Sequence, residues 1–315
     1  MDNIKRFDTA LASLAPQTAS LFLSLSDEEK SRIREIRLRT GKPVIAVTSD
    51  GAAFIMPSGR LSRVYSDLAV CASEKDIQDT FHRLCSYSVY SFKDAINKGY
   101  ITVRGGHRAG VAGTAATDNS SVTAVRDISC INLRIAREIK GAADGIFDCA
   151  FRNGTEDVII AGPPSSGKTT VLRDLARQLS GAERGFFAKT FVCDERGELG
   201  AVYSGIPQND LGINCDIITS YPKSEGIIIG LRSFSPDIII CDEIATEAEA
   251  KAVESGLASG VRFALSIHAE NETDLRSKPI MKSLLSTGAF KKVFLLSSKN
   301  VSRIEKCISA GDLLD

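Results

Sequence analysis

The amino-acid sequence predicts an α/β protein of two domains: a smaller α+β domain over residues 1–135 and a C-terminal domain with a mostly parallel sheet over residues 136–315. The length of 315 residues suggests two domains at a usual size of about 150 residues each. After residue 136, short apolar segments rich in Ile, Val and Phe alternate with helical patterns, as in a sheet with crossover helices. The first 135 residues instead combine helical patterns with alternating, glycine-broken strands.

The expected elements of the first domain follow from periodicity and capping signals. Leu and Phe recur at helical spacing near the N-terminus, and a Ser-Asp-Glu-Glu segment forms a capping box. Two later segments alternate and are broken by glycine, which predicts strands joined by tight turns. The expected elements are helices within 4–25 (interrupted by Pro16), after Ser26, from Ser73 to about residue 86 and on to Gly99, with strands within 35–55 and 100–116.

The expected strands of the second domain are short and apolar, as strands covered on both faces should be. The change of pattern falls near INLRIAREIKGAADG, and no long flexible linker, internal repeat or low-complexity tract is present. The strands are predicted at 157–161, 188–194, 236–241, 262–267 and 291–298.

Composition is typical of soluble globular proteins, with 43% hydrophobic and 25% charged residues. Lys plus Arg and Asp plus Glu balance at 39 each, so no overall charge points to nucleic acid or anionic lipid. Aromatic residues amount to 6% and tryptophan is absent, which leaves few side chains for stacking on bases. These values argue against nucleic acid as a partner.

The cysteines and apolar segments predict a cytoplasmic location. The eight cysteines form no CxxC pair and several lie in apolar runs such as FVCDE and IIICDE, which favours buried free thiols in a reducing compartment. No apolar run approaches the roughly 18 residues that span a bilayer, and the N-terminal segment lacks the core of a signal peptide. Any membrane contact is therefore expected through partners.

A glycine-rich loop lies between the first predicted strand of the second domain and a predicted helix. It fits the pattern G-x-x-x-x-G-K-[ST], in which glycines let backbone N–H groups face phosphates and the helix dipole adds positive potential. Lys168 is expected to reach the β and γ phosphates of ATP, and the Thr169 hydroxyl to bind Mg²⁺. The predicted nucleotide-binding residues are Gly162, Pro163, Pro164, Ser165, Ser166, Gly167, Lys168, Thr169 and Thr170.

Two acids end the apolar segment 238–241. Asp242 is expected to hold the Mg²⁺ shell through water, and Glu243 to orient and deprotonate the attacking water. The alternative is a pair of surface carboxylates at a strand end. The presence of the phosphate loop in the same domain makes this alternative less favoured. A base aimed at water would waste ATP in a kinase, so the pair favours hydrolysis.

Other polar residues near strand ends have two interpretations each. Asp194 and Glu195 complete the Mg²⁺ and water network or lie in a solvated turn. Ser266 and His268 sense the γ phosphate or are ordinary strand-end polar groups. Arg232 pairs with phosphate or with an acid across a subunit boundary, or it stabilises a helix C-terminus.

The predicted hairpin of the first domain carries basic residues at its turn. Arg104, His107 and Arg108 lie among glycines that form a bulge or tight turn. The functional interpretation is that these side chains are exposed and reach a ligand or a neighbouring subunit.

In this order, the segments resemble the ATPases of type II and type IV secretion and pilus assembly. Those enzymes have a phosphate loop, an acidic box, an LR-x-x-PD segment before a second acidic strand, and a histidine box; the counterparts are GPPSSGKT, CDERGE, LRSFSPDIIICDE and SIHAEN. The whole chain is more similar still to the stage III sporulation protein AA family, through GYITVRGGHRAGVAG, AGPPSSGKTT, FVCDERGELG and PDIIICDEI.

The resemblance implies a RecA-like P-loop ATPase domain and a motor that works as a ring, a homo-oligomer expected to be a hexamer. It further implies a cytoplasmic ATPase of the mother cell, held at the membrane by membrane-anchored subunits of a channel to the forespore. By analogy, Arg104 and Arg108 become candidates to complete the nucleotide site of a neighbouring subunit. The chain departs from the secretion ATPases after Glu243, where Ile-Ala-Thr-Glu replaces their Arg-Asp pair, and it lacks a tetracysteine zinc module.

Three rival functions stay open at this point. A nucleic-acid motor would be revealed by hydrolysis that single-stranded DNA stimulates. A small-molecule kinase is disfavoured because no lid-like insertion with clustered arginines follows the phosphate loop. A scaffold that binds ATP without hydrolysing it would never turn ATP over, even with its partners.

Overall fold

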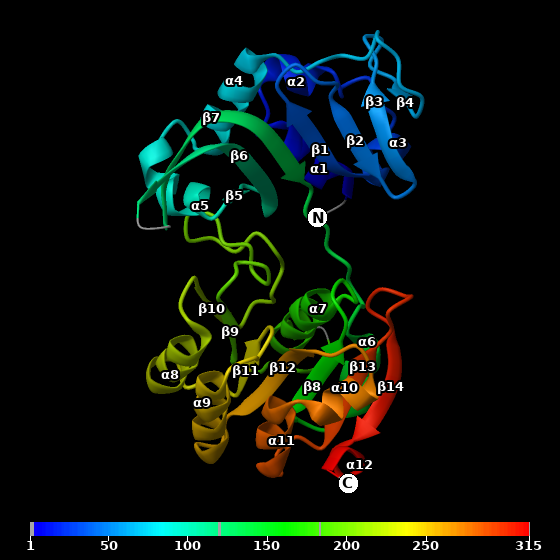
Figure 1. The fold of residues 1–315 in the computed structure, drawn as a ribbon. Coiled ribbons are helices and arrows are strands. Elements are labelled where there is room, and N and C mark those ends of the chain that lie inside the picture. The colour runs from blue at the N-terminus through cyan, green and yellow to red at the C-terminus, as the bar shows by residue number, and fades with distance from the viewer. Residues whose placement is uncertain (1–2, 119–120, 183, 315) are drawn as a thin grey trace. The chain divides into compact units, whose positions relative to one another are not determined.

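The computed structural model describes residues 3–118, 121–182 and 184–314 and divides the chain into two compact units (Figure 1). The first unit comprises Met1–Glu138 and Tyr203–Gln208, and the second comprises Ile139–Val202 and Asn209–Asp315. The segment 203–208 lies within the C-terminal half of the sequence, so its membership of the first unit depends on tertiary contacts that no local pattern reveals.

The first unit is built on an antiparallel sheet. Within the described residues the sheet has seven strands in the order β4-β3-β2-β1-β7-β6-β5. The strands are β1 (Ile33–Arg39), β2 (Ile45–Thr48), β3 (Gly51–Ile55), β4 (Leu61–Ser62), β5 (Tyr100–Val103), β6 (His107–Asp118) and β7 (Ser121–Arg134). The helices are α1 (Asn3–Leu11), α2 (Pro16–Ser20), α3 (Asp27–Arg32), α4 (Glu74–Leu84), the 3₁₀ helix η1 (Val89–Phe92) and α5 (Lys93–Asn97).

Local signals account for several of these boundaries. The predicted capping box at Ser26 is confirmed, because its hydroxyl accepts from the Glu29 amide and the Glu29 carboxylate accepts from the Ser26 amide. Ser73 caps α4 in the same way with Asp76. The hairpin between β5 and β6 turns at Gly105 and Gly106, whose φ angles of 88° and 76° lie in the left-handed region that favours glycine.

The hairpin residue His107 is buried, which corrects the expectation that it lies exposed at the turn. His107 is the first residue of β6, and strand alternation points its side chain to the same face as the buried Ala109 and Val111. Its Nδ1 accepts a hydrogen bond from the Ala136 amide at 3.1 Å. Arg108 faces the other way, with its guanidinium carbon 3.6 Å from the centroid of the Tyr100 ring.

We expect acid to destabilise the first unit through His107. Burial, with a smaller effect of the Arg6 charge, lowers the pKa of His107 from 6.5 to about 4. Because the folded pKa lies below the unfolded one, the stabilisation is fully present above pH 6.5 and is lost as pH falls toward 4, by roughly 3 kcal/mol. Urea denaturation of His107→Gln should show a flatter pH dependence across this window, and parallel losses in both proteins would contradict the prediction.

The second unit is an α/β layer structure around a mostly parallel sheet. Within the described residues the strand order is β10-β9-β11-β12-β8-β13-β14, with all pairs parallel except β13 with β14. The strands are β8 (Val158–Gly162), β9 (Thr190–Asp194), β10 (Cys215–Thr219), β11 (Ile238–Cys241), β12 (Arg262–His268), β13 (Lys292–Leu296) and β14 (Ile304–Ser309). The helices are α6 (Asp144–Ala150), α7 (Lys168–Ser180), α8 (Lys223–Ser233), α9 (Glu247–Ala258), α10 (Glu272–Ser277), α11 (Pro279–Ser286) and α12 (Ala310–Leu314).

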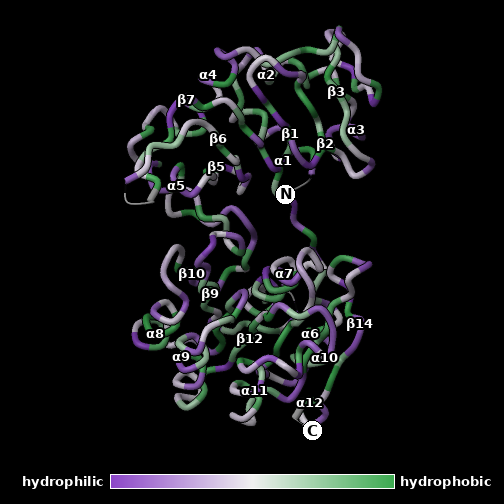
Figure 2. Tube along the Cα trace, viewed as in Figure 1, coloured by the Kyte–Doolittle hydropathy of each residue, from purple (hydrophilic) through white to green (hydrophobic). Residues whose placement is uncertain are grey.

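Helices cover both faces of this sheet. Alternate residues of the inner strands, such as Ile159 and Ala161, pack with α8, α9 and α11, whereas Val158 and Ile160 pack with α6 and α7. The inner strands are therefore apolar on both faces, and β8 belongs to the hydrophobic, green stretches of Figure 2. The edge strands β10 and β14, which the sequence analysis did not predict, are partly exposed and carry charged residues.

Two further observations concern the described residues. No helix among them is long and apolar enough to cross a membrane. Cys193 and Cys241, on the neighbouring strands β9 and β11, are buried as the apolar runs around them predict. Cys71, Cys149 and Cys307 are exposed, which corrects the expectation that the free thiols are buried.

Candidate functional site

The polar residues that the sequence analysis selected follow the carboxyl ends of four neighbouring parallel strands. The loop after β8 leads into α7, β9 ends at Asp194, β11 precedes Asp242, and β12 ends at His268. Ligands of open parallel sheets bind at this edge, because loops and helix N-termini meet there. The sheet therefore brings these segments together although almost 110 residues separate the first from the last, at 162 and 268.

The glycine-rich loop leaves no room for a side chain at Gly167. This residue caps α7 with a φ angle of 95°, and a Cβ atom there would lie 2.8 Å from the Ser302 amide nitrogen. The Ser302 amide donates a hydrogen bond of 2.7 Å to the Ser166 carbonyl, so the segment after β13 closes against the loop. Both the left-handed backbone and this close approach require glycine.

Lys168, at the start of α7, is buried with 8% of its surface exposed. Its ammonium donates to the carbonyls of Gly162 and Pro163 at 2.7 and 2.8 Å. Among the described residues no carboxylate lies within ion-pairing distance of Nζ, and burial lowers the pKa of Lys168 although Asp242 and Glu243 act in the opposite direction. A buried ammonium that contacts only carbonyl oxygens is suited to an incoming anion such as a phosphate.

The phosphate loop is hydrogen-bonded directly to the acid after β11. The Thr169 hydroxyl donates to Asp242 Oδ2 at 2.5 Å, and the Ser266 hydroxyl of β12 donates to Asp242 Oδ1. A hydroxyl and a carboxylate oxygen are the ligands that Mg²⁺ prefers, and Mg²⁺ at phosphate sites needs only one or two protein ligands. Thr169 and Asp242 thus fit an Mg²⁺ ion, while the described residues contain no cluster of three or more His, Cys, Asp or Glu side chains that could hold a metal without a substrate.

Glu243 has a backbone conformation that is uncommon for a residue with a side chain. Its φ angle is 61°, in the left-handed region, and its amide donates to the Ser266 hydroxyl at 2.8 Å. Its carboxylate is one-third exposed and pairs with Arg196, which the sequence analysis did not select. Both residues line the hollow beside the acids, and no sequence signal marks Arg196 for this contact.

Asp194 organises a turn. The side chain is buried and its two oxygens accept hydrogen bonds from the amides of Glu198 and Gly200 at 2.8 and 2.9 Å. Burial raises the pKa of Asp194, while these backbone hydrogen bonds act in the opposite direction. The next residue, Glu195, forms an ion pair instead, with a carboxylate oxygen 3.5 Å from the ammonium of Lys223.

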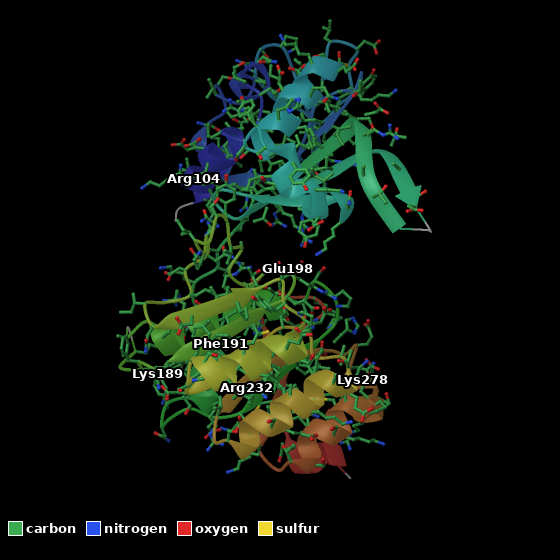
Figure 3. The ribbon with its side chains drawn as sticks, turned by 90° about the vertical axis from the view of Figure 1, so that its left-hand side faces the viewer. Arg104, Lys189, Phe191, Glu198, Arg232 and Lys278 are labelled. Atoms are coloured by element: carbon green, nitrogen blue, oxygen red, sulfur yellow. The ribbon has the colours of Figure 1, made fainter. Side chains whose placement is uncertain are left out.

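His268 lies at the site, whereas Arg232 does not. His268 pairs in register with Gly162, and the next residue, Ala269, donates from its amide to the Gly162 carbonyl at 3.1 Å. Arg232 is in the last turn of α8, near the amino end of β11, and is exposed (Figure 3). Within one subunit its position fits the helix-terminal alternative, because a cation is favourable at the C-terminus of a helix.

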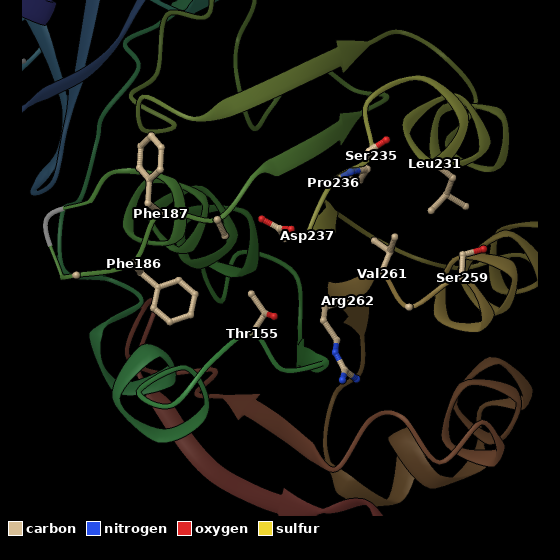
Figure 4. A pocket seen from close by; sticks show the side chains of 13 residues that line it. Thr155, Phe186, Phe187, Leu231, Ser235, Pro236, Asp237, Ser259, Val261 and Arg262 are labelled. Atoms are coloured by element: carbon tan, nitrogen blue, oxygen red, sulfur yellow. The ribbon is translucent and has the colours of Figure 1, made fainter.

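Two hollows lie at opposite ends of the strands. A cavity of about 850 Å³ adjoins the acids and is lined by Glu195, Arg196, Lys223, Glu243, Thr246 and His268, among others. A groove of about 670 Å³ opens at the amino ends of β11 and β12, beside Asp237 and Arg262 (Figure 4). The first hollow adjoins the candidate site, because Glu243 and His268 line it at the carboxyl ends of the strands, where the phosphate loop also lies.

The residues after Glu243, where the sequence departs from the secretion-ATPase pattern, include the N-terminal cap of α9. The Thr246 hydroxyl accepts from the Glu249 amide, and the Glu249 carboxylate accepts from the amides of Ala245 and Thr246 at 2.7 and 2.9 Å. The four residues that replace an Arg-Asp pair therefore lead into the capping box of α9.

The fold is similar to that of solved ATPases of secretion and pilus systems. The chain superposes on the crystal structure of the pilus retraction motor PilT with bound ADP at a TM-score of 0.53 and 15% identity, covering 84% of this chain and 74% of that one. The X-ray structure of the Legionella pneumophila ATPase DotB gives a TM-score of 0.51 at 15% identity, covering 84% and 72%. At these identities the likeness concerns the fold.

The protein is a member of the family described as sporulation stage III, protein AA, whose model matches residues 11–308. It is 34% identical over 289 residues to stage III sporulation protein AA of Bacillus subtilis (strain 168), covering 91% of this chain and 90% of the relative. The family resemblance predicted from the motifs is thereby confirmed.

Proposed function

We propose that this protein is an Mg²⁺-dependent ATP hydrolase that energises a membrane channel or secretion complex during sporulation. The observation that carries the proposal is the direct hydrogen bond between Thr169 of the phosphate loop and Asp242, with Glu243 as the next residue. This contact joins the two halves of a hydrolytic site.

ATP binding would use groups that are already in place. The backbone amides of 167–169, at the N-terminus of α7, would face the phosphates, and Lys168 would exchange its carbonyl partners for β and γ phosphate oxygens. Thr169 and Asp242 would hold Mg²⁺, which when bound neutralises charge that develops on the phosphate oxygens.

Hydrolysis would use Glu243 as the general base. Its carboxylate takes a proton from water as the water oxygen bonds to the γ phosphorus, and the bond from that phosphorus to the β–γ bridging oxygen breaks. ADP and inorganic phosphate are the products, and the proton passes from Glu243 to solvent or phosphate. Arg196 pairs with Oε2 of this carboxylate, so the second carboxylate oxygen would act as the proton acceptor.

The test is phosphate release by the purified full chain with ATP and Mg²⁺, with and without single-stranded DNA. Turnover that needs Mg²⁺ and ignores DNA supports the proposal. Stimulation by DNA would favour the nucleic-acid motor instead. ATP binding without turnover, even with membrane partners, would favour the non-hydrolysing scaffold.

We further propose that the protein acts as a homo-oligomeric ring, a hexamer by family resemblance, in the mother-cell cytoplasm beside membrane-anchored channel subunits. The mass of the particle with and without ATP and Mg²⁺ tests the assembly. A nucleotide-dependent hexamer is the expected result, and a persistent monomer would mean that assembly requires the membrane partner.

Arg104 or Arg108 is proposed to complete the site of a neighbouring subunit. Arg104 is exposed at the hairpin turn, and loss of an arginine that acts in trans is expected to lower turnover by roughly 10³-fold. Oligomers that mix Arg108→Ala and Lys168→Ala subunits should regain turnover, because one interface then combines an intact arginine with an intact phosphate loop. Arg126→Ala, at an exposed position of β7, is the control. Full turnover in both the Arg104 and Arg108 variants would exclude the proposal.

A further inference from the structure

We infer that Lys223 is a positioning residue that holds the backbone of Glu243 in its left-handed conformation and thereby aims the carboxylate. The expected effect of Lys223 on catalysis rests on the proposed function. The expected effect of Lys223 on the backbone of Glu243 does not depend on that function.

Lys223 is buried and its ammonium lies among oxygen atoms of the acidic segment. Only 6% of the residue is exposed. Nζ donates to the carbonyl of Glu243 at 2.6 Å and to that of Asp242 at 3.3 Å, and it lies 3.4 Å from a carboxylate oxygen of Glu249 and 3.5 Å from one of Glu195. Two of its four partners are thus the main-chain carbonyls of the two acids proposed for Mg²⁺ binding and base catalysis.

The Glu243 backbone needs such support. A residue with a Cβ atom in the left-handed region is strained and persists there only when its surroundings hold it. The amide of Glu243 is bonded to the Ser266 hydroxyl, and the carbonyl accepts from Lys223. The residue is therefore fixed on both sides, and Lys223 supplies the carbonyl side.

The segment after Glu243 is anchored by the same ammonium. Burial by itself raises the pKa of Glu249, but hydrogen bonds from the Ala245 and Thr246 amides and the nearby Lys223 charge outweigh it, so the pKa is lowered. Glu249 is therefore a carboxylate that holds these two amides while it pairs with Lys223. Residues 243–246 thus lie between two connected anchors.

The stability of α8 does not explain a lysine at position 223. Lys223 is the first residue of α8, and the positive end of a helix dipole disfavours a cation at that position. The lysine would weaken α8 slightly unless its charge is used elsewhere. Its contacts indicate that the charge is used to hold the acidic segment and the cap of α9.

The experiment compares Lys223→Met with Lys251→Met, which removes the same group from an exposed position on α9. We expect the crystal structure of Lys223→Met to show Glu243 outside the left-handed region or with its peptide rotated. Turnover is expected to fall about 100-fold, the typical effect of a small misplacement of a reacting group. ATP affinity should stay within about three-fold, because the contacts of the phosphate loop are untouched. Lys251→Met should match the wild type.

An unchanged Glu243 backbone in Lys223→Met would overturn the inference. If the wild-type protein hydrolyses ATP, an equal turnover in Lys223→Met would also overturn it. If the wild type hydrolyses no ATP, the proposed function fails, and the structure of Lys223→Met still decides the expected effect on the backbone of Glu243. If Lys223→Met does not fold, Lys223→Gln replaces it, because glutamine keeps one donor for the Glu243 carbonyl. This variant should lose turnover by about ten-fold, a smaller displacement of the same group. Unchanged turnover in Lys223→Gln, together with a crystal structure of the variant that shows no side-chain donor on the Glu243 carbonyl, would overturn the inference.

Discussion

Glu243→Gln is expected to bind ATP as tightly as the wild type and to turn it over about 10³-fold or more slowly, within the range for loss of a general base. Glutamine has the same shape, and the bonds that fix residue 243, from its amide to Ser266 and from Lys223 to its carbonyl, involve only the main chain of this residue. Only the proton acceptor and the ion pair with Arg196 are removed. The measurement combines a single-turnover assay with detection of intact ATP retained by the protein after gel filtration.

Glu156→Gln is the matched control for this variant. Glu156 is an exposed glutamate just before β8, at the amino end of the strand, with a carboxylate oxygen 3.8 Å from the ammonium of Lys292. Its replacement should leave turnover unchanged. Unaltered turnover in Glu243→Gln would remove this residue from the role of base and point to another group at the strand ends.

Lys168→Ala is expected to lower kcat/KM by about 10³-fold to 10⁴-fold. The lost charged hydrogen bonds to phosphate would weaken ATP binding by about 10-fold to 100-fold, and loss of charge stabilisation in the transition state would lower kcat by about 100-fold. Burial lowers the pKa of Lys168, so its charged form is costly to keep buried, and alanine should not lower the melting temperature. Titration calorimetry with ATP and thermal denaturation measure the two effects separately.

Lys189→Ala provides the comparison. Lys189 is exposed just before β9, at the amino end of the strands and away from the phosphate loop (Figure 3). The variant should bind and hydrolyse ATP normally. If Lys168→Ala binds ATP with wild-type affinity, the loop 162–169 is not the phosphate site.

The inner strands and the phosphate loop were predictable because their signals are local. A doubly covered strand such as β8 must be apolar at every position, and the spacing of Gly162, Gly167 and Lys168 reflects the geometry of one short loop. The edge strands β10 and β14 escaped prediction because, among the residues that the structure describes, one side of each has no neighbouring strand and several side chains face solvent. Their sequences therefore lack the continuous apolar run on which the other predictions depended.

The candidate site was predictable in part. Asp242 and Glu243 follow an apolar strand beside a phosphate loop, so their sequence context carried the prediction, and the Thr169 contact to Asp242 agrees with it. The sequence context marked Asp194 as a candidate in the same way, but its carboxylate oxygens accept hydrogen bonds from backbone amides of the turn that follows it. Sequence could not separate these two outcomes, because both are acids at strand ends.

By itself the sequence determined the order of motifs, the inner strands and the family, since each depends on residues that are near neighbours in the chain or on a pattern along its whole length. Only the tertiary structure decided which charges meet. Lys223 and Arg196 reach the Glu243 residue from α8 and from the turn after β9, and His107 is turned into the core by the alternation of β6. Such contacts depend on the order of the strands and on the direction in which each side chain points. Pairing between segments that are distant in the sequence sets both, so no local spacing of residues encodes them.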